Sequence, residues 1–472
     1  MEGLELFLEP ESEQSFKVIE TRFGTTSSIL PFFEGGTDFR TTLIRVLEIT
    51  AYPDAEYEPE RFSPEEQKWL IKVGLVNPAT QAFHEPKILL ANLGKHLYQS
   101  LFPGSTKAEN ALRALWQKAK PSGDELHIQF RFEASSVEKN RAADYPWELA
   151  HDGERFLAWH KVSFSRYIAY GDLPPTLPPV NQINVLLVSS EAYNTGQGLK
   201  KFSRSERKAI REGLETASEQ GHIRLIDLAE EIDDTPTFKE LTKYLEEHRG
   251  LDQPHVLHFD GHGLYGRKCS CCGKIYPGIN TQICVNPTCN KNALQSAQGY
   301  LVFEQESGEP DYVSAETLGT VIENLTPNRD DSGQGRLAVV VLSACQSGMA
   351  AAGDSVFNGT AQTLIHHAMP AVVAMQYSVG VKAATNFAES FYRSLGQKDP
   401  LATAVRKARI AMDLDEHHWY RPVLYLRWHD NVGGQLFASE VSTPQTNIGV
   451  PFQAPPLPGY YVERPEVSDA LK

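Results

Sequence analysis

The second half of the chain alternates short apolar runs with stretches in which apolar residues recur every three or four positions. The apolar runs cover residues 183–190, 223–228, 256–262, 339–343 and 371–376. Runs of this length are typical of strands that are buried on both faces of a sheet. The intervening periodicity is typical of helices that lie on a sheet. The pattern therefore predicts an α/β fold with a mainly parallel sheet flanked by helices.

Capping sequences predict where several of these helices begin. Ser203 with Glu206 has the spacing of a capping box. Thr235-Pro236 and Asp399-Pro400 each combine an N-cap side chain with a proline suited to the first helical turn. Residues 356–368 have helical spacing as well. Further strands are predicted from apolar alternation at residues 126–132, 156–167, 300–304, 311–313 and 423–428.

A proline-rich stretch divides the chain into predicted domains. Residues 173–180 contain four prolines and predict a stiff linker. Residues 1–172 before it form a mixed α/β region, and residues 181–435 after it carry the regular α/β pattern. Residues 436–472 are polar and proline-rich, which predicts a tail or linker. The last six residues resemble a helix start, so we expect the chain to continue in a longer protein, with a disordered tail as the alternative.

Composition excludes several classes of protein. The hydrophobic fraction is 41% and the charged fraction 22%, as in soluble globular proteins. The formal charge of −15 argues against a large nucleic-acid surface. The basic cluster at 200–211 falls on a predicted helix and is interpreted as a solvated face. No apolar run has the length of a membrane span, and the first residues lack a signal-peptide core, so we expect a cytoplasmic protein.

Two of the apolar runs end at a reactive side chain followed by glycine. The first ends at His262-Gly263, and the second continues into Cys345, with Gly348 behind it. If both runs are parallel strands of one sheet, both side chains emerge at its carboxyl edge, where open α/β sheets bind ligands. A thiol beside an imidazole is the equipment of a cysteine nucleophile. The N–H groups of Gly263 and Cys345 would then form the oxyanion hole.

The simpler interpretation of each residue is structural. A cysteine that ends an apolar strand is usually a small buried residue, and a histidine there is usually satisfied by a carbonyl. His258 is a competing histidine, since it alternates in phase with His262. We prefer His262 as the catalytic residue because it ends the run beside a glycine, and we expect His258 to pack within the sheet or behind the site.

The segments around His262 and Cys345 resemble the two signature segments of CHAT domains, a branch of the caspase–separase clan of cysteine peptidases. The resemblance runs from residue 183 to 428. Upstream, residues 146–149 and 156–158 resemble the amino-terminal half of CHAT proteins, which in this clan can be a degenerate caspase-like subdomain. The resemblance implies a caspase-like fold and peptide-bond hydrolysis through a thioester acyl-enzyme, with Cys345 and His262 as the catalytic pair.

The substrate preference is open. Caspases take aspartate before the scissile bond in a basic pocket, whereas Ser343, two residues before Cys345, is neither acidic nor basic. Asp354 and Glu191 are acidic candidates for a substrate pocket. Each is more often an ordinary surface or capping carboxylate.

A cysteine cluster predicts a metal site. Five of the six cysteines fall between residues 269 and 289, which in a reducing compartment suggests metal rather than disulfides. The predicted ligands are two close pairs, Cys269 with Cys272 and Cys284 with Cys289. Four thiolates suit a closed, structural Zn²⁺ site in a ribbon over residues 267–297. Cys271 could replace Cys269 or stay free, and inactive reduced cysteines are the alternative.

The ribbon is inserted directly after His262. We therefore hypothesise that zinc fixes a lobe that gates or selects the substrate, with a stabilised loop of no further role as the alternative. Residues 459–465 resemble the lead-in to NTPase domains of bacterial immune receptors. That resemblance implies a partner region, absent from this chain, that holds the peptidase silent until a sensor oligomerises.

The sequence thus predicts a cysteine endopeptidase that acts on a protein substrate, as a regulated effector in bacterial antiphage defence. The first alternative is a non-catalytic CHAT-like interaction module with a structural zinc ribbon. The second is a ribbon that senses nucleic acid, which the charge balance disfavours. The chain contains no phosphate-binding Gly-x4-Gly-Lys-Ser/Thr sequence.

Overall fold

The structure is a computed structural model of the 472-residue chain. It describes residues 2–20, 24–34, 36–49, 62–104, 106–134, 141–171, 177, 179–192, 211–212, 214–215, 218–219, 221–248, 253–277, 281–289, 293–325, 337–343, 356–377, 379–412, 417–427 and 432–438. Among the helices in this part of the chain, none combines the length and the hydropathy that a membrane span requires. Residues 1–437 group into one unit, and residues 438–472 into a second.

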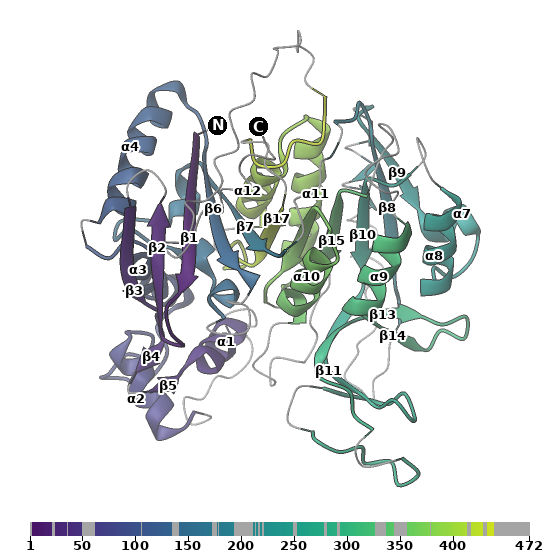
Figure 1. Ribbon diagram of the computed structural model, residues 1–472, viewed down its shortest axis with the longest axis horizontal. Coiled ribbons are helices and arrows are strands. Elements are labelled where there is room, and N and C mark those ends of the chain that lie inside the picture. The colour runs from purple at the N-terminus through teal and green to yellow at the C-terminus, as the bar shows by residue number, and fades with distance from the viewer. Residues whose placement is uncertain are drawn as a thin grey trace, which may run out of the picture. The chain divides into compact units, whose positions relative to one another are not determined.

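One sheet of eleven strands runs through the first unit (Figure 1). Its strands, in spatial order, are β3 (Gly24–Ile29), β2 (Ser15–Glu20), β1 (Glu2–Pro10), β6 (Leu126–Glu133), β7 (Val162–Ala169), β17 (Pro422–Leu426), β16 (Ala371–Met375), β15 (Val339–Ser343), β10 (Val256–Asp260), β8 (Ile183–Ser189) and β9 (Ile223–Asp227). Only the pairs β1–β2, β2–β3 and β16–β17 are antiparallel. The predicted α/β class with a mainly parallel, helix-flanked sheet is confirmed.

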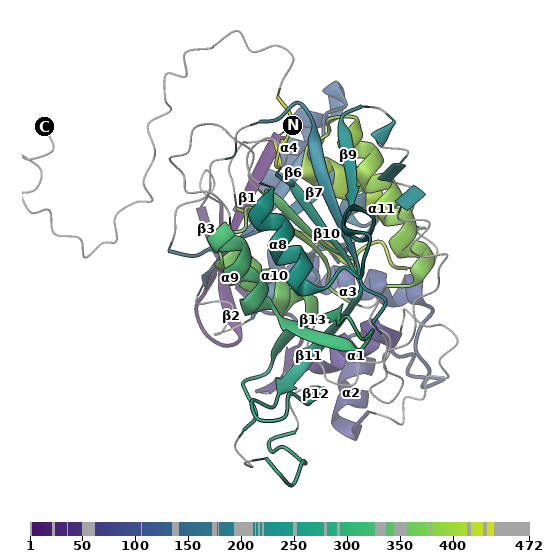
Figure 2. The same cartoon turned by 90° about the vertical axis from the view of Figure 1, so that its right-hand side faces the viewer.

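Alternation along the central strands divides their side chains between two helical layers. Val339 and Val341 pack with the layer formed by α11 (Val381–Gly396) and α12 (Leu401–Ala411). Val340 and Leu342 pack on the opposite face, which is covered by helices α8 (Phe238–Glu247), α9 (Ala315–Leu325) and α10 (Val356–His366), as Figure 2 shows. Both faces are therefore covered, which explains why these strands read as continuous apolar runs.

The amino-terminal strands belong to the same sheet and have their own core. In that core, apolar side chains of β1, β2 and β6 pack with those of the helices that precede β6 in the chain. The other regular elements of this amino-terminal region are β4 (Phe33–Glu34), β5 (Thr37–Asp38), α1 (Arg40–Ile49), α2 (Pro64–Lys72), α3 (Pro86–Leu101), α4 (Lys107–Ser122) and the 3-10 turns η2 (Ala142–Asp144), η3 (Trp147–Leu149) and η4 (Leu157–His160). Because β7 lies beside β17, the sheet continues across the predicted linker. The domain boundaries stay predictions.

A second, four-stranded sheet lies beside the first and begins at His262. Its order is β12 (Ile275–Pro277), β11 (His262–Lys268), β13 (Gln298–Glu304) and β14 (Pro310–Ser314). The predicted hairpin is confirmed as β13–β14. We expected His262 to end the apolar strand, and this prediction was wrong. Strand β10 ends at Asp260, and His262 opens the next strand after a turn at Gly261.

Two predicted helix starts were misplaced. Helix α8 is capped by the hydroxyl of Thr237, which accepts the N–H of Glu240 at 3.2 Å, rather than by Thr235. Helix α12 follows Pro400, and Asp399 instead accepts hydrogen bonds from the side chains of Ser394 and Lys407, 2.5 Å each. The short helix α7 (Leu228–Ile232) follows β9. Most of the helix predicted after Ser203 lies outside the described residues.

Candidate active site and metal centre

The two predicted catalytic segments leave neighbouring strands of the large sheet. Strands β10 and β15 are parallel and adjacent, with Asp260 paired to Ser343. Just beyond that pair, the N–H of Gly261 donates to the carbonyl of Ser343 at 3.3 Å. In the sequence, His262 comes two residues after Asp260 and Cys345 two residues after Ser343. Cys345 itself lies outside the described residues.

His262 is fixed by its place at the start of β11. It pairs with Val302 of β13, and Gly263 pairs with Leu301. The side chain of His262 is 3% exposed. By strand alternation it shares a face with Leu264, which packs in a small apolar cluster with Ala192. The imidazole is therefore held by a packed sheet.

His258 lies within the central sheet, as predicted. Its ring is completely buried, and Nδ1 is 2.8 Å from the hydroxyl of Tyr392 on α11. Burial lowers the pKa of His258 to about 3, because charging an imidazole in an apolar core is costly. His258 is thus a neutral packing residue at physiological pH.

The predicted substrate-pocket residues differ in what the structure says of them. Ser343 is buried at the end of β15. Glu191 follows β8, the other neighbour of β10, and its backbone N–H donates to Glu304 at 3.1 Å. Asp354 lies outside the described residues. Ser343 ends β15, Glu191 follows β8 and His262 follows β10. These three strands are adjacent and parallel, so the three residues lie at the same carboxyl edge of the sheet.

A buried ion pair that the sequence analysis missed connects the amino-terminal part of the sheet to the end of β16. The guanidinium of Arg166, on β7, bonds both carboxylate oxygens of Glu148 at 3.1 and 2.5 Å, and both side chains have no exposed surface. Arg166 also donates to Gln376, directly after β16, at 3.1 Å. The amide of Gln376 in turn bonds the carbonyl of Asp144. The signal available in the sequence was a glutamate set among aromatic and apolar residues at 145–149.

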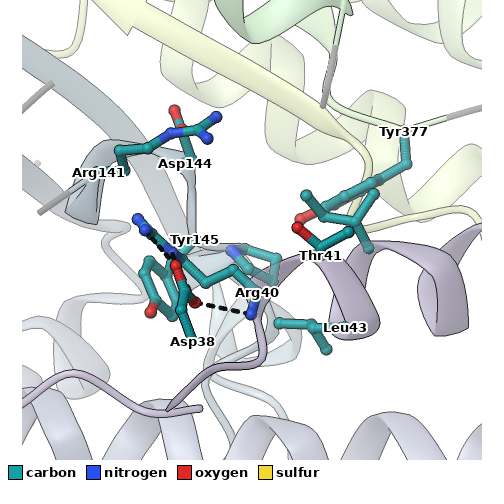
Figure 3. A pocket seen from close by; sticks show the side chains of 10 residues that line it. Asp38, Arg40, Thr41, Leu43, Arg141, Asp144, Tyr145 and Tyr377 are labelled. Atoms are coloured by element: carbon teal, nitrogen blue, oxygen red, sulfur yellow. Dashed lines mark hydrogen bonds and ion pairs between the residues drawn. The ribbon is translucent and has the colours of Figure 1, made fainter. Parts of the chain in front are cut away.

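A small cavity lies next to this network (Figure 3). Its volume is about 30 Å³, room for one or two water molecules. Two ion pairs line it, Asp38 with Arg40 at 2.5 Å and Arg141 with Asp144 at 2.7 Å. The remaining wall includes Tyr377, two residues after β16. Because each charge is already paired, the cavity favours no charged ligand.

A larger open groove of about 840 Å³ lies along β11 and α10. Tyr265 and Gly299, a cross-strand pair of β11 and β13, form one side. Gln362 and His366 of α10 form the other. By alternation, Tyr265 is on the same face of β11 as Gly263. The groove has the volume of sites that hold small molecules or short peptide segments.

The four predicted metal ligands lie together. The sulfur atoms of the cluster are all within 4.8 Å of one another, and they belong to Cys269, Cys272, Cys284 and Cys289. The Sγ atoms of Cys272 and Cys284 are 3.8 Å apart. A disulfide would bring two sulfurs to about 2.05 Å, whereas a tetrahedral ion with Zn–S bonds of about 2.3 Å separates them by about 3.8 Å. The cluster therefore fits a metal ion.

The backbone between Cys269 and Lys274 forms a tight turn. Cys269 donates its N–H to the carbonyl of Lys274 at 2.8 Å, and Gly273, at φ +69°, closes the turn. This left-handed conformation favours glycine. Hydrogen bonds lower the pKa of Cys272 to about 6; the largest effect comes from the backbone of Lys274 and the next from the side chain of Cys289. The lower pKa favours the thiolate that metal binding needs.

Two further residues, Tyr276 and Cys271, differ in their relation to the cluster. The hydroxyl of Tyr276 lies 3.2 Å from Cys284 Sγ and accepts the N–H of Val285 at 3.0 Å. Cys271 is exposed and is not one of the four clustered thiols. The alternative in which Cys271 replaces Cys269 is therefore not the arrangement found.

Comparisons with solved structures find similarity at low sequence identity. The Arg-specific cysteine proteinase gingipain R matches at 10% identity over 71% of this chain and 70% of its own, with a TM-score of 0.37. The complex of Porphyromonas gingivalis RgpB pro- and mature domains matches at 11% identity over 71% of each chain, with a TM-score of 0.36. In the Saccharomyces cerevisiae separase–securin complex the match has 12% identity and a TM-score of 0.39, and covers 90% of this chain but 30% of the other.

A comparison with the curated proteins found no match. The family model of the CHAT domain, in contrast, matches residues 137–430. This range includes β10, β15, the cysteine cluster and the Glu148–Arg166 pair. It covers more than half of the chain, and the protein therefore belongs to the CHAT domain family.

Proposed function

We propose that this protein is a cysteine endopeptidase that cleaves a protein substrate, with Cys345 as nucleophile and His262 as its proton acceptor. The observation that carries the proposal is the register of β10 and β15, in which Asp260 pairs with Ser343. Equal offsets of two residues separate this pair from His262 and Cys345 in the sequence. Membership of the CHAT family supports the same assignment.

In the proposed reaction, the sulfur of Cys345 attacks the scissile carbonyl carbon while His262 takes the thiol proton. The carbonyl oxygen becomes an oxyanion, which accepts hydrogen bonds from the N–H groups of Gly263 and Cys345, each contributing about 3 kcal/mol. The C–N bond then breaks, and the amine leaves with the proton from His262. Water hydrolyses the resulting thioester, giving its proton to His262 and releasing the thiolate.

A groove runs beside the proposed site, along β11 and α10. It lies on the face of β11 that carries Gly263 and Tyr265, opposite to the face of His262, so we assign to it a part of the peptide that is remote from the scissile bond. We propose Ser343, Glu191 and Asp354 as candidate pocket residues for the residue before the scissile bond. The side chain that they select is left to experiment.

The cysteine cluster is proposed to hold a structural Zn²⁺. Four thiolates from Cys269, Cys272, Cys284 and Cys289 fill a tetrahedral ion and leave no open position for substrate. The ion would fix the lobe between β11 and β13, next to the groove. Removing zinc with a chelator and measuring cleavage tests whether this lobe gates the substrate, and unchanged cleavage would exclude gating.

The decisive test compares the wild type with Cys345→Ala and His262→Ala. Each purified form is incubated with the proteins encoded by neighbouring genes, and cut sites are identified by mass spectrometry. We expect cleavage to fall at least a hundredfold in both variants while far-UV circular dichroism stays unchanged. Cys271→Ala, which removes an exposed thiol outside the cluster, is the matched control and keeps full activity.

A second measurement needs no substrate. A histidine that accepts the thiol proton raises the rate at which Cys345 reacts with iodoacetamide near neutral pH. We expect His262→Gln to slow this alkylation at pH 7 and to shift its midpoint to higher pH. An alkylation profile that His262→Gln leaves unchanged would argue that the two side chains do not share a proton.

One observation favours the non-catalytic alternative, an interaction module with a zinc-stabilised lobe. The side chain of His262 is nearly inaccessible at 3% exposed surface. If the protein only binds partners, Cys345→Ala binds them as the wild type does, and neither form cuts them.

The biological role that we propose is a regulated effector in bacterial antiphage defence, activated through a further sensor region of the same protein. The sequence at 459–465 motivates this role. Expressing the wild type and Cys345→Ala in phage-challenged cells tests it. Equal plaque counts for both forms would contradict it.

A further inference from the structure

The segment that forms the cysteine lobe differs in charge from the rest of the chain. Between Asp260 and Glu304 the sequence contains no acidic residue, although the whole chain has a formal charge of −15. The same segment contains four cations, which are Arg267, Lys268, Lys274 and Lys291. Four thiolates around the proposed Zn²⁺ would leave two negative charges, fewer than these cations supply. The lobe is therefore a basic segment of an acidic protein.

Two of these cations lie at the same end of the paired strands β11 and β12, which Figure 2 labels. Arg267 of β11 pairs with Tyr276 of β12, so both side chains point to the same face. The ammonium of Lys274 lies 5.4 Å from the centre of the Tyr276 ring. Lys268, in contrast, donates to the carbonyl of Tyr312 at 3.0 Å. Tyr276 thus brings Arg267 and Lys274 together, and these two residues are called the basic patch.

Neither cation of the basic patch has a carboxylate partner in the described part of the chain. The Nε atom of Arg267 is buried and has no hydrogen-bond partner among the described residues, and the residue as a whole is half-buried. Lys274 is exposed. Hydrogen bonds from a guanidinium to a carboxylate are among the stronger polar contacts in proteins. The patch therefore has donors that an anionic group could use.

The basic patch continues the groove along β11 and α10. By strand alternation, Gly263, Tyr265 and Arg267 share one face of β11, and Tyr265 lines the groove. Four residues of strand separate Gly263 from Arg267, a length of about 13 Å that about four residues of an extended peptide span. A peptide segment that follows β11 past Tyr265 therefore reaches Arg267.

The charged groups of the groove itself do not cancel the basic patch. Glu316 is the carboxylate among the residues that line the groove. It lies 3.1 Å from Nε2 of His367 on α10 and is therefore already in an ion pair when that imidazole is protonated. Because Arg267 and Lys274 have no such partner, the uncompensated charge along this face of β11 is positive.

We propose that the basic patch binds an acidic side chain of the protein substrate, in the segment that lies in the groove and away from the scissile bond. The inference rests on the proposed peptidase function and adds a substrate class to it. Arg267 would hold the carboxylate through its planar donor fork, and Lys274 would add a second positive charge. Such complementary charge selects the substrate among proteins that share a cleavable bond.

The surroundings of the patch favour a protein segment over a nucleic acid. Single-stranded nucleic acids bind by stacking bases on exposed aromatic rings, but Tyr276 is only 7% exposed. The exposed large side chains nearby are aliphatic, since Val285 donates its N–H to the Tyr276 hydroxyl and Ile283 precedes the ligand Cys284. Aliphatic side chains suit the apolar residues of a peptide, and two cations would neutralise few phosphates.

The experiment measures the binding of four rhodamine-labelled probes to the full chain by fluorescence anisotropy. Three probes are the peptides (Gly-Glu-Ser)4, (Gly-Gln-Ser)4 and (Gly-Lys-Ser)4, and the fourth is a single-stranded DNA of matching length. We expect the glutamate peptide to bind about fivefold more tightly than the glutamine peptide, because exposed ion pairs contribute modestly. The preference is expected to shrink between about 50 and 300 mM NaCl, because salt screens exposed charges.

The matched variants remove the same amount of charge from different places. Arg267→Gln with Lys274→Gln is expected to abolish the preference for the glutamate peptide. Lys87→Gln with Lys239→Gln, at two exposed helix positions, is expected to keep it. Because Arg267 is half-buried, Lys274→Glu at a fully exposed position serves as the second variant if the double variant misfolds. We expect Lys274→Glu to reduce the preference at least twofold.

Three results would overturn the proposal. The first is equal binding of the glutamate and glutamine peptides to the wild type. The second is a preference that survives in the patch variants while their zinc affinity falls, which would mean that the cations only neutralise the thiolates. The third is DNA that binds more tightly than the glutamate peptide and is lost in the same variants. Binding is measured equally well in Cys345→Ala, so failure here is separable from failure of the peptidase assignment.

Discussion

The carboxyl edge of the large sheet and the cysteine lobe beside it are held together in different ways. At the sheet, β10 and β15 are buried on both faces, and the fully buried Glu148–Arg166 pair reaches Gln376 at the end of the neighbouring strand β16. Among the described residues of the lobe, the buried apolar cluster consists of Cys269, Tyr276 and Cys284 with a few half-buried neighbours. Ile283 and Val285, on either side of a ligand, are 49% and 64% exposed.

The difference shows which force orders each region. Apolar burial orders the sheet edge and needs no metal, whereas a lobe with so small a core is what the proposed metal–thiolate bonds would stabilise. We therefore expect the strands of the predicted catalytic edge and the lobe beside them to unfold under different conditions. The predictions below test this separation.

The largest expected effect is the loss of lobe structure when zinc is removed. Structural zinc sites bind with free energies on the order of 10 kcal/mol, so the lobe should unfold without the ion. We expect amides of residues 269–289 to lose hydrogen-exchange protection after chelation, while those of β10 and β15 keep theirs. If the sheet strands lose protection as well, the two regions are not separable.

The next effect concerns only the sheet edge. Glu148→Gln removes the carboxylate charge that neutralises the buried guanidinium of Arg166. The same carboxylate lies 3.7 Å from the guanidinium of Arg409. Leaving buried charges unpaired is expected to cost about 3–5 kcal/mol in the free energy of unfolding, measured by urea denaturation. Glu154→Gln, at an exposed turn position, is the control. Bound zinc should not change in either variant, and zinc loss in Glu148→Gln would contradict the comparison.

Acid is expected to weaken the core through its buried histidines. Burial lowers the pKa of His258 to about 3 and that of His255 to about 4. The unfolded chain binds these protons near pH 6.5, so the free energy of unfolding is highest above that pH and falls as pH drops toward 3. For His258 alone the loss by pH 4.5 is about 2–3 kcal/mol.

The histidine prediction is checked by urea denaturation between pH 4.5 and 7.5. His258→Gln should make stability less dependent on pH, because the buried imidazole of His258 is no longer there to be charged, while His255 keeps its own contribution. His366→Gln, at an exposed position, should leave the slope as it is in the wild type. A slope unaffected by His258→Gln would mean that other groups govern acid sensitivity.

The smallest effect returns to the lobe. Tyr276→Phe removes the hydroxyl that contacts Cys284 Sγ and accepts the N–H of Val285. Losing such an outer contact of a metal ligand usually weakens metal binding tenfold or more, about 1.4 kcal/mol. Competition with a chromogenic chelator measures the affinity. We expect the urea midpoint of the sheet to stay unchanged.

Local patterns predicted most strands and the metal ligands. Continuous apolar runs located the strands β8, β9, β10, β15 and β16 within about two residues. The cysteine spacing identified the four clustered thiols. Capping was predicted less well, because Thr235 and Thr237 carry the same hydroxyl and only the backbone conformation decides which one caps α8.

What the sequence determined by itself is therefore periodicity and spacing: the α/β class, the cysteine pairs, and the two runs that lead to His262 and Cys345. Only the tertiary structure decided that β10 lies beside β15 with Asp260 opposite Ser343. It also decided that Arg166 meets Gln376, 210 positions away, and that β3 is left at the edge. Periodicity reports which face of an element is buried, but the choice of neighbour depends on packing between segments distant in sequence, which no local pattern encodes.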